Sequence, residues 1–175
     1  MMQIHDMFNL QMQSKNLEFK FFHSNVMPEN FVSDDRRLKQ VLINLISNAL
    51  KFTSEGSIQV HSKFDTESKM LYFDVIDSGV GIKKADQVQL FKMFGKLQYT
   101  SKQNQQGIGL GLNVCKRIVN EYNGEMSVQS DIGKGSKFSF GFQVKEFTLK
   151  ASQDGADIQE LRQLNFNTNE KPPRA

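Results

Sequence analysis

The sequence is poor in the residues that build disulfide frameworks and metal-thiolate sites. Its 175 residues contain one cysteine, Cys115, which rules out an internal disulfide and any metal site made from several cysteines. Tryptophan is absent, and there are only three prolines and three histidines. The formal net charge is +3, and the 22 lysines and arginines are scattered along the chain, which excludes a typical nucleic-acid reader.

Long apolar stretches are missing as well. The chain has no run of about 18 apolar residues, and its N-terminus lacks the basic-then-apolar pattern of a secretory signal. We therefore expect this chain to lie in the cytoplasm, whether or not it belongs to a longer, membrane-anchored protein. Its length suits one domain with appendages, and Cys115, which lies among Val114, Ile118 and Val119, is interpreted as a small core residue.

The clearest periodic pattern lies between residues 35 and 53 and predicts a helix with one apolar face. On a second face, Asn44, Asn48 and Lys51 follow one another at positions i, i+4 and i+7. Amide oxygens can take part in octahedral Mg²⁺ coordination, and a lysine can neutralise a phosphate, so this face suits a metal-bound polyphosphate. The alternative is that both asparagines lie on a solvated face. The apolar face is formed by Leu38, Val41, Leu42, Leu45, Ile46, Ala49 and Leu50.

A single carboxylate follows two stretches of alternating polarity, residues 57–64 and 70–76, which predict a β-hairpin. Asp77 stands at the end of the second strand, and the glycine-containing segment SGVGI, residues 78–82, comes directly after it. A buried carboxylate needs a hydrogen-bond donor, and the exocyclic amine of adenine is a suitable one. The alternative is an ordinary tight turn.

A glycine-rich segment, GIGLGL at residues 107–112, opens a predicted helix that runs to Tyr122. Glycines at a helix start leave N–H groups free to hold a phosphate. The third glycine comes one residue too early for the dinucleotide fingerprint, and no strand immediately precedes the segment. The polar stretch before it, residues 95–106, is typical of a functional lid.

The remaining pattern predicts further elements with no chemistry of their own. His23 and His61 have no partner at metal-ligand spacing, and His5 is interpreted as an exposed helix residue. The core is expected to end near Phe147, and residues 150–175 resemble a polar linker. The predicted elements are an N-terminal helix ending near residue 15, strands at 17–22 and 31–33, a helix at 83–94, and strands at 125–130 and 136–144.

In this order and spacing, the motifs resemble the catalytic and ATP-binding domain of sensor histidine kinases, within the superfamily that includes Hsp90, gyrase and MutL-type ATPases. The resemblance covers about residues 3–146, and five ordered motifs carry it. These are NLISNALKFT (44–53), which is similar to the N box, DSGVGI (77–82) to the G1 box, 91–94 to the F box, GIGLGL (107–112) to the G2 box, and GKGS (133–136) to the final glycine motif.

The resemblance implies an α+β fold, a two-layer α/β sandwich known as the Bergerat fold, with a mixed, mostly antiparallel sheet packed under three helices and a mobile ATP lid. It implies ATP and Mg²⁺ as cofactors, with Asn48 as the metal ligand, Asp77 accepting from adenine and Ile82 covering the base. The implied catalytic residues are Asn44, Asn48 and Lys51. The implied nucleotide-binding residues are Asp77, Gly79, Gly81, Ile82, Phe94, Lys96, Gly107, Gly109, Leu110, Gly111, Leu112 and Ser136.

Two residues depart from the family pattern, and one position separates activities within the superfamily. Ile108 stands where a small or hydroxyl residue is frequent, and Ser136 where threonine is usual. In the members that hydrolyse ATP, a glutamate that activates water precedes the metal asparagine by four residues. Asn44 occupies that position here, and an amide cannot act as a general base.

The resemblance also implies a division of the chain. Residues 1–16 would be a helix that follows absent dimerisation helices, residues 17–148 the ATP-binding catalytic domain, and residues 149–175 a polar tail or linker. No histidine lies in the phosphoacceptor pattern H-E/D-x-R/K-N/T-P, so the acceptor would sit on a separate dimerisation domain, in the parent chain or in trans.

We therefore expect a protein histidine kinase half of a two-component phosphorelay, which binds Mg-ATP and passes the γ-phosphoryl group to that histidine. A response regulator or receiver domain would be the downstream partner, with no nucleic-acid or membrane contact by this chain. The alternatives are a degenerate regulatory domain that binds no nucleotide and a superfamily ATPase clamp.

Overall fold

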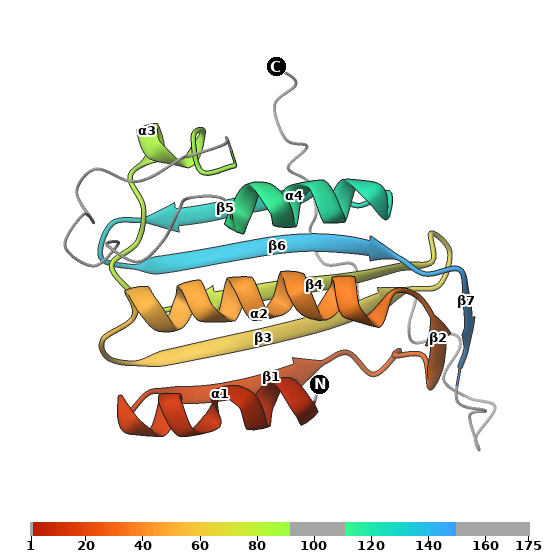
Figure 1. Cartoon of the computed structure of the whole chain (residues 1–175), viewed down its shortest axis with the longest axis horizontal. Coiled ribbons are helices and arrows are strands. Elements are labelled where there is room, and N and C mark those ends of the chain that lie inside the picture. Colours follow the sequence, from red (N-terminus) through yellow and green to blue (C-terminus); the bar gives the residue numbers. More distant parts are fainter. Residues whose placement is uncertain (1, 92–110, 150–175) are drawn as a thin grey trace.

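The structure, a computed structural model, describes residues 2–91 and 111–149. Within these ranges the chain forms four helices and seven strands (Figure 1). The helices are α1 (Met2–Ser14), α2 (Asp35–Phe52), α3 (Lys84–Gln87) and α4 (Gly111–Glu121). The strands are β1 (Glu18–His23), β2 (Asn30–Val32), β3 (Ser57–Asp65), β4 (Met70–Asp77), β5 (Met126–Asp131), β6 (Gly135–Gln143) and β7 (Glu146–Thr148).

Five of the strands form the main sheet, in the order β1-β3-β4-β6-β5. Only β1 runs parallel to its neighbour, β3, whereas the other three pairings are antiparallel. The remaining two strands, β2 and β7, form a small antiparallel sheet of their own. The predicted mixed, mostly antiparallel sheet is therefore confirmed, and so is the hairpin of β3 and β4.

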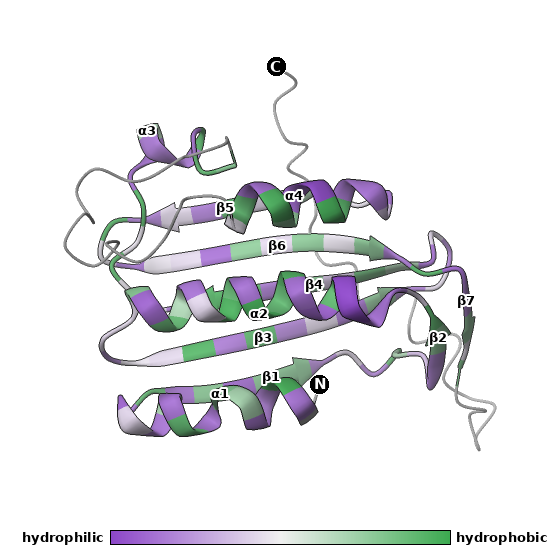
Figure 2. Cartoon of the chain, viewed as in Figure 1, coloured by the Kyte–Doolittle hydropathy of each residue, from purple (hydrophilic) through white to green (hydrophobic). Residues whose placement is uncertain are grey.

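Helices α1, α2 and α4 lie on the same side of the main sheet, with α2 across its middle (Figure 1). All seven residues of the predicted apolar face of α2 are buried. They meet inward strand residues such as Val60, Val75, Phe138 and Phe140, and α1 contributes Ile4 and Phe8 to the same core. Figure 2 shows hydrophobic and hydrophilic residues interleaved along α2 and α4, as expected for helices with one buried face.

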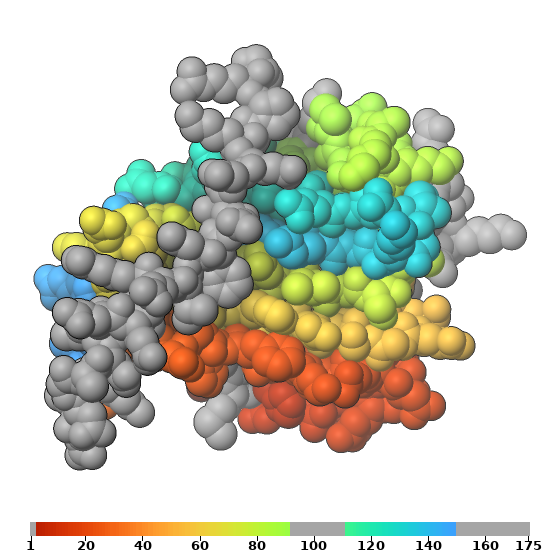
Figure 3. Space-filling model, turned by 180° about the vertical axis from the view of Figure 1, so that it is seen from behind, coloured from red at the N-terminus to blue at the C-terminus, as the bar shows by residue number. Residues whose placement is uncertain are grey.

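The opposite face of the sheet carries polar and half-buried side chains, because successive strand residues point to opposite sides. In β3 the residues from Ser57 to Phe64 alternate between partly exposed and buried positions. In the view from behind, the strands themselves form bands at the visible surface (Figure 3). The fold is thus the two-layer α/β sandwich that the sequence predicts.

Two elements differ from the expected ones. The predicted helix at 83–94 is only the four residues of α3, after which Val88 is 74% exposed and the chain continues in turns to residue 91. The side chain of Gln87 bonds to Ile82 and Ser130 instead of lying along a longer helix. Strand β7 was not expected, and it forms because residues 146–148 pair with β2.

Candidate active site

Three segments that are distant in the sequence meet at one end of the sandwich, where α2 and β4 end and β6 begins (Figure 1). The end of α2 contacts the loop after β4, since the N–H of Val80 donates to the carbonyl oxygen of Phe52 at 3.2 Å. Asp77, the last residue of β4, lies directly opposite Ser136 of β6. The N-box, G1-box and final glycine segments are therefore neighbours in the fold, as a common site would require.

Asp77 is a buried acid at the centre of this site, with 7% of its surface exposed. Its Oδ1 accepts from the N–H of Gly79 at 2.9 Å, and the backbone N–H and hydroxyl of Ser136, opposite it on β6, also favour the ionised carboxylate. Burial raises the pKa of the Asp77 carboxyl above its ordinary value, although these three donors act in the opposite direction. A partly satisfied, buried carboxylate is well suited to accept a further hydrogen bond from a ligand.

The turn after Asp77 requires a glycine at position 81. The φ angle of Gly81 is +70°, and a Cβ added there would lie 1.9 Å from the carbonyl oxygen of Asp131. The backbone of the G1 segment is therefore packed directly against the end of β5. Ile82, the next residue, is 9% exposed and belongs to the core cluster.

Gly81→Ala is expected to lower the free energy of unfolding by about 2–4 kcal/mol, because the new methyl group meets a backbone carbonyl in a conformation that already strains an L residue. Gly133→Ala is the matched control. Gly133 also has a positive φ, +75°, but a Cβ there has nothing within 4 Å, so only a cost of about 1–2 kcal/mol for the left-handed backbone remains. Urea unfolding of both variants measures the difference, and equal losses would contradict the packing argument.

The two asparagines of α2 contact each other, and the first turn of α4 lies against one of them. Nδ2 of Asn48 donates to Oδ1 of Asn44 at 3.3 Å, and both side chains are half-buried. Gly111 leaves no room for a side chain, since a Cβ there would lie 2.5 Å from Nδ2 of Asn44. The alternative of a freely solvated face is therefore wrong for Asn44, which lies between α2 and the start of α4.

The other expected site residues are only partly accounted for. The ammonium group of Lys51 lies 5.3 Å from the ring centroid of Phe52, and Leu112 is half-buried against the core. The predicted lid at 95–106 lies outside the described residues. So do the expected nucleotide contacts Phe94, Lys96, Gly107, Gly109 and Leu110.

Two residues that no motif singled out connect parts of the site. The hydroxyl of Ser130, on β5, accepts from the N–H of Ile82 at 2.8 Å, and Nε2 of Gln87 donates to the carbonyl oxygens of Ile82 and Ser130 at 2.9 and 2.7 Å. A signal for Ser130 existed in the alternation of β5, which places this polar residue on the buried face with Met126. Gln87 had no comparable signal.

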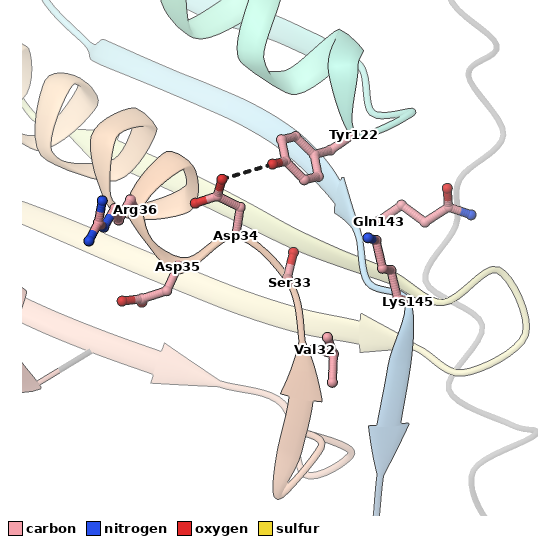
Figure 4. A pocket seen from close by; sticks show the side chains of 8 residues that line it. All are labelled: Val32, Ser33, Asp34, Asp35, Arg36, Tyr122, Gln143 and Lys145. Atoms are coloured by element: carbon pink, nitrogen blue, oxygen red, sulfur yellow. Dashed lines mark hydrogen bonds between the residues drawn. The ribbon is translucent and has the colours of Figure 1, made fainter.

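A separate hollow of about 640 Å³ lies at the other end of the sandwich, beside β2 and the start of α2 (Figure 4). Its polar groups serve to fix the helix start: the Asp34 carboxylate accepts from the N–H of Arg37 at 3.0 Å and from the Tyr122 hydroxyl at 3.1 Å. These hydrogen bonds lower the pKa of Asp34, the first of them most strongly. None of the expected site residues that the structure describes lines this hollow.

Comparison with known proteins defines the class of the chain. Residues 33–146 match the family described as histidine kinase-, DNA gyrase B-, and HSP90-like ATPase. Because the match covers more than half of the sequence, the chain belongs to this family, as the resemblance of its motifs indicated.

The individual relatives are sensor kinases much longer than this chain. It is 38% identical over 131 residues to the aerobic respiration control sensor protein ArcB of Escherichia coli, which covers 74% of the chain and 17% of ArcB. It is 38% identical over 129 residues to hybrid signal transduction histidine kinase B of Dictyostelium discoideum, covering 72% of the chain and 7% of that protein. The chain thus spans less than a fifth of either relative.

Solved structures share the fold. Full-length ShkA in complex with AMPPNP superposes with a TM-score of 0.71 at 25% identity, covering 86% of this chain and 30% of ShkA. The catalytic domain of histidine kinase ThkA superposes with a TM-score of 0.66 at 26% identity, covering 81% of this chain and 88% of that domain.

None of the helices in the described part of the chain combines the length and the hydropathy that a membrane span requires.

Proposed function

We propose that this chain is the ATP-binding catalytic domain of a histidine kinase, which holds Mg-ATP and presents its γ-phosphoryl group to a histidine on a separate domain. The observation that carries the proposal is the buried Asp77 carboxylate, which the loop after β4 connects to the end of α2, the helix that carries the Asn44–Asn48 pair. The names of the sensor kinases that the chain matches, and the AMPPNP complex of ShkA, support it.

In this proposal Asp77 recognises adenine. Its carboxylate accepts from the exocyclic amine, while Gly79 and Ser136 hold it in place from the protein side. Gly79 and Gly81 bring the backbone close to the base, and the buried side chain of Ile82 covers it. Guanine carries a carbonyl oxygen where adenine has its amine, so an ionised carboxylate at this position disfavours guanine.

The phosphates would lie towards the start of α4. Gly111 and Leu112 stand in its first turn, where unpaired N–H groups and the positive end of the helix dipole favour an anion. Lys51 would neutralise phosphate charge, and residues 107–110 and the lid at 95–106 would complete the cradle. Phe94 and Lys96 would belong to the same nucleotide site.

The residues present fit a magnesium ion through amide oxygen. Because Nδ2 of Asn48 donates to Asn44, the amide of Asn48 is oriented with its oxygen away from that partner, and amide oxygen is an acceptable Mg²⁺ ligand. A bound Mg²⁺ would neutralise charge on the β- and γ-phosphates. Asn48 would hold the ion, and Asn44 would fix the orientation of Asn48.

The same pair argues for transfer rather than hydrolysis. An amide at position 44 takes no proton from water, so the chain would position the phosphoryl group without activating a water molecule. Positioning alone accelerates transfer to a well-placed imidazole. The histidine would come from a dimerisation domain in the parent chain or in trans, and a response regulator or receiver domain would take the phosphoryl group onward.

Calorimetric titration of AMPPNP into the 175-residue chain, with and without Mg²⁺, tests the proposal. We expect micromolar binding that tightens with Mg²⁺, together with ATP hydrolysis far slower than the roughly 1–100 s⁻¹ typical of kinases. Absence of binding would favour the degenerate regulatory domain. Rapid hydrolysis would favour the ATPase clamp.

A further inference from the structure

We propose that Ser130 is a positioning residue for the nucleotide base, which fixes Ile82 and the Ser136–Asp77 pair in one arrangement and thereby sets the preference for adenine over guanine. This inference rests on the proposed function, because it assumes that Asp77 and Ile82 contact the base. Ser130 lies outside the five motifs, at the end of β5, and only 6% of its surface is exposed.

Ser130 holds the backbone on the side of the base cover. The N–H of Ile82 donates to its Oγ at 2.8 Å, a buried bond between residues 48 positions apart. The carbonyl oxygen of Ile82 accepts from Nε2 of Gln87 at 2.9 Å, and the same nitrogen donates to the carbonyl oxygen of Ser130 at 2.7 Å. Both polar backbone groups of Ile82 are therefore tied to Ser130, one directly and one through Gln87.

Ser130 also reaches the acid. Its Oγ lies 2.7 Å from the carbonyl oxygen of Gly135 and 3.1 Å from Oγ of Ser136, so its single hydroxyl hydrogen is shared between these acceptors. Ser136 in turn lies directly opposite Asp77 in the sheet, where its backbone N–H and hydroxyl favour the ionised carboxylate. One buried hydroxyl thus links the residue that would cover the base to the residue that would read it.

This linkage has a consequence for binding because a pre-organised site does not have to be ordered by its ligand. Without the hydroxyl, the N–H of Ile82 loses its acceptor, and the Ser136 side chain loses one neighbour that fixes it. Only a fraction of the molecules then holds Asp77 and Ile82 in the binding arrangement. The apparent association constant for adenine nucleotides is reduced in proportion to that fraction. Rejection of guanine weakens as well, since it depends on where the carboxylate is held.

The test compares ADP and GDP as probes on the full 175-residue chain, by displacement of a fluorescent ATP analogue. We expect Ser130→Ala to weaken ADP binding about five- to twentyfold and GDP binding less than about twofold. Ser127→Ala is the matched control, because Ser127 is an exposed serine on the same strand. It is expected to leave both affinities unchanged.

The ADP and GDP affinities distinguish a failure of the Ser130 inference from a failure of the proposed function. Native chain that binds ADP, with a Ser130→Ala variant that keeps the native ADP-to-GDP preference, overturns the inference and leaves the proposed function standing. An equal loss for both nucleotides also overturns it, because it indicates a purely structural role. A native chain that binds neither nucleotide overturns both proposals.

A second variant keeps the inference testable where Ser130→Ala does not fold. Gln87→Ala removes one of the two bonds to the Ile82 backbone from a half-buried side chain and leaves the Ser130 hydroxyl in place. We expect a smaller loss of the ADP-to-GDP preference, about two- to fivefold. An unchanged preference in Gln87→Ala would overturn the inference.

Discussion

Asp77→Asn is expected to weaken ATP binding by about 100-fold, close to 3 kcal/mol, while the domain remains folded. Asparagine keeps the shape of the side chain but replaces one acceptor oxygen with an NH₂ donor. If its oxygen continues to accept from Gly79 and its NH₂ group faces the ligand, that group meets another donor, the amine of adenine. Calorimetric titration with AMPPNP measures the loss.

Asp74→Asn is the matched control for this prediction. Asp74 lies on the same strand but on the opposite face of the sheet, where its carboxylate is 3.8 Å from the ammonium group of Lys137. Its neutralisation is expected to change the ATP affinity by less than about twofold, because exposed ion pairs contribute little. A loss below threefold in Asp77→Asn, or an equal loss in both variants, would contradict the adenine role of Asp77.

Asp77→Asn is also expected to raise the free energy of unfolding of the nucleotide-free domain by about 0.5–2 kcal/mol at neutral pH. Burial raises the pKa of Asp77, so the folded state binds a proton there more readily than the unfolded chain. The resulting stabilisation is present below the unfolded pKa and is lost as pH rises through the folded pKa. Unfolding of both proteins across the acid range would show this loss in the native chain and not in Asp77→Asn.

Much of the fold follows from periodic patterns that are long enough to be read without a structure. The apolar stripe of α2 extends over 13 residues, from Leu38 to Leu50, and every one of its seven positions is buried. The alternation of β3 and β4 likewise predicts which side chains meet the helices, because a strand has a period of two. Both elements bury enough apolar surface for the sequence to determine their structure.

Short elements were less predictable because tertiary contacts decide them. The apolar residues between 83 and 94 suggest a longer helix. In the structure, however, Leu90 is buried whereas Val88 is exposed. Strand β7 has only three residues and forms because it pairs with β2, so no local sequence pattern predicts it. A segment of three or four residues gains little from its own propensity.

The sequence predicts site residues where chemistry and spacing coincide, and it misses residues that only hydrogen bonds between distant segments bring together. Asp77 and Asn44 stand in motifs whose residue types suit a nucleotide; the structure pairs Asp77 with Ser136 and places Asn44 against the start of α4. The side chains of Ser130 and Gln87 both bond to the backbone of Ile82. Ser130 is 48 residues away from Ile82 in the sequence, and Gln87 is 5 residues away. Such pairs become visible only after the chain has folded.

Asn48→Ala is expected to abolish the effect of Mg²⁺ on ATP affinity, so that the dissociation constants with and without the ion become equal. The amide of Asn48 provides the proposed ligand oxygen, and alanine offers no oxygen in its place. Because Asp77 and the base pocket are untouched, binding of the metal-free nucleotide is expected to stay within about twofold of the native value. Titration of ATP at fixed Mg²⁺ and in excess chelator measures both constants.

Two further asparagine variants decide whether the loss belongs to the metal site. Asn44→Ala removes the acceptor, 3.3 Å from Nδ2 of Asn48, that orients the ligand amide, so a smaller loss of Mg²⁺ dependence is expected. Asn120→Ala changes an exposed asparagine of α4 and is expected to retain the native ratio. If Asn48→Ala keeps the native ratio of ATP dissociation constants without and with Mg²⁺, other groups hold the metal. If the loss of Mg²⁺ dependence increases from Asn120→Ala through Asn44→Ala to Asn48→Ala, the Asn44–Asn48 contact holds the ligand oxygen in position.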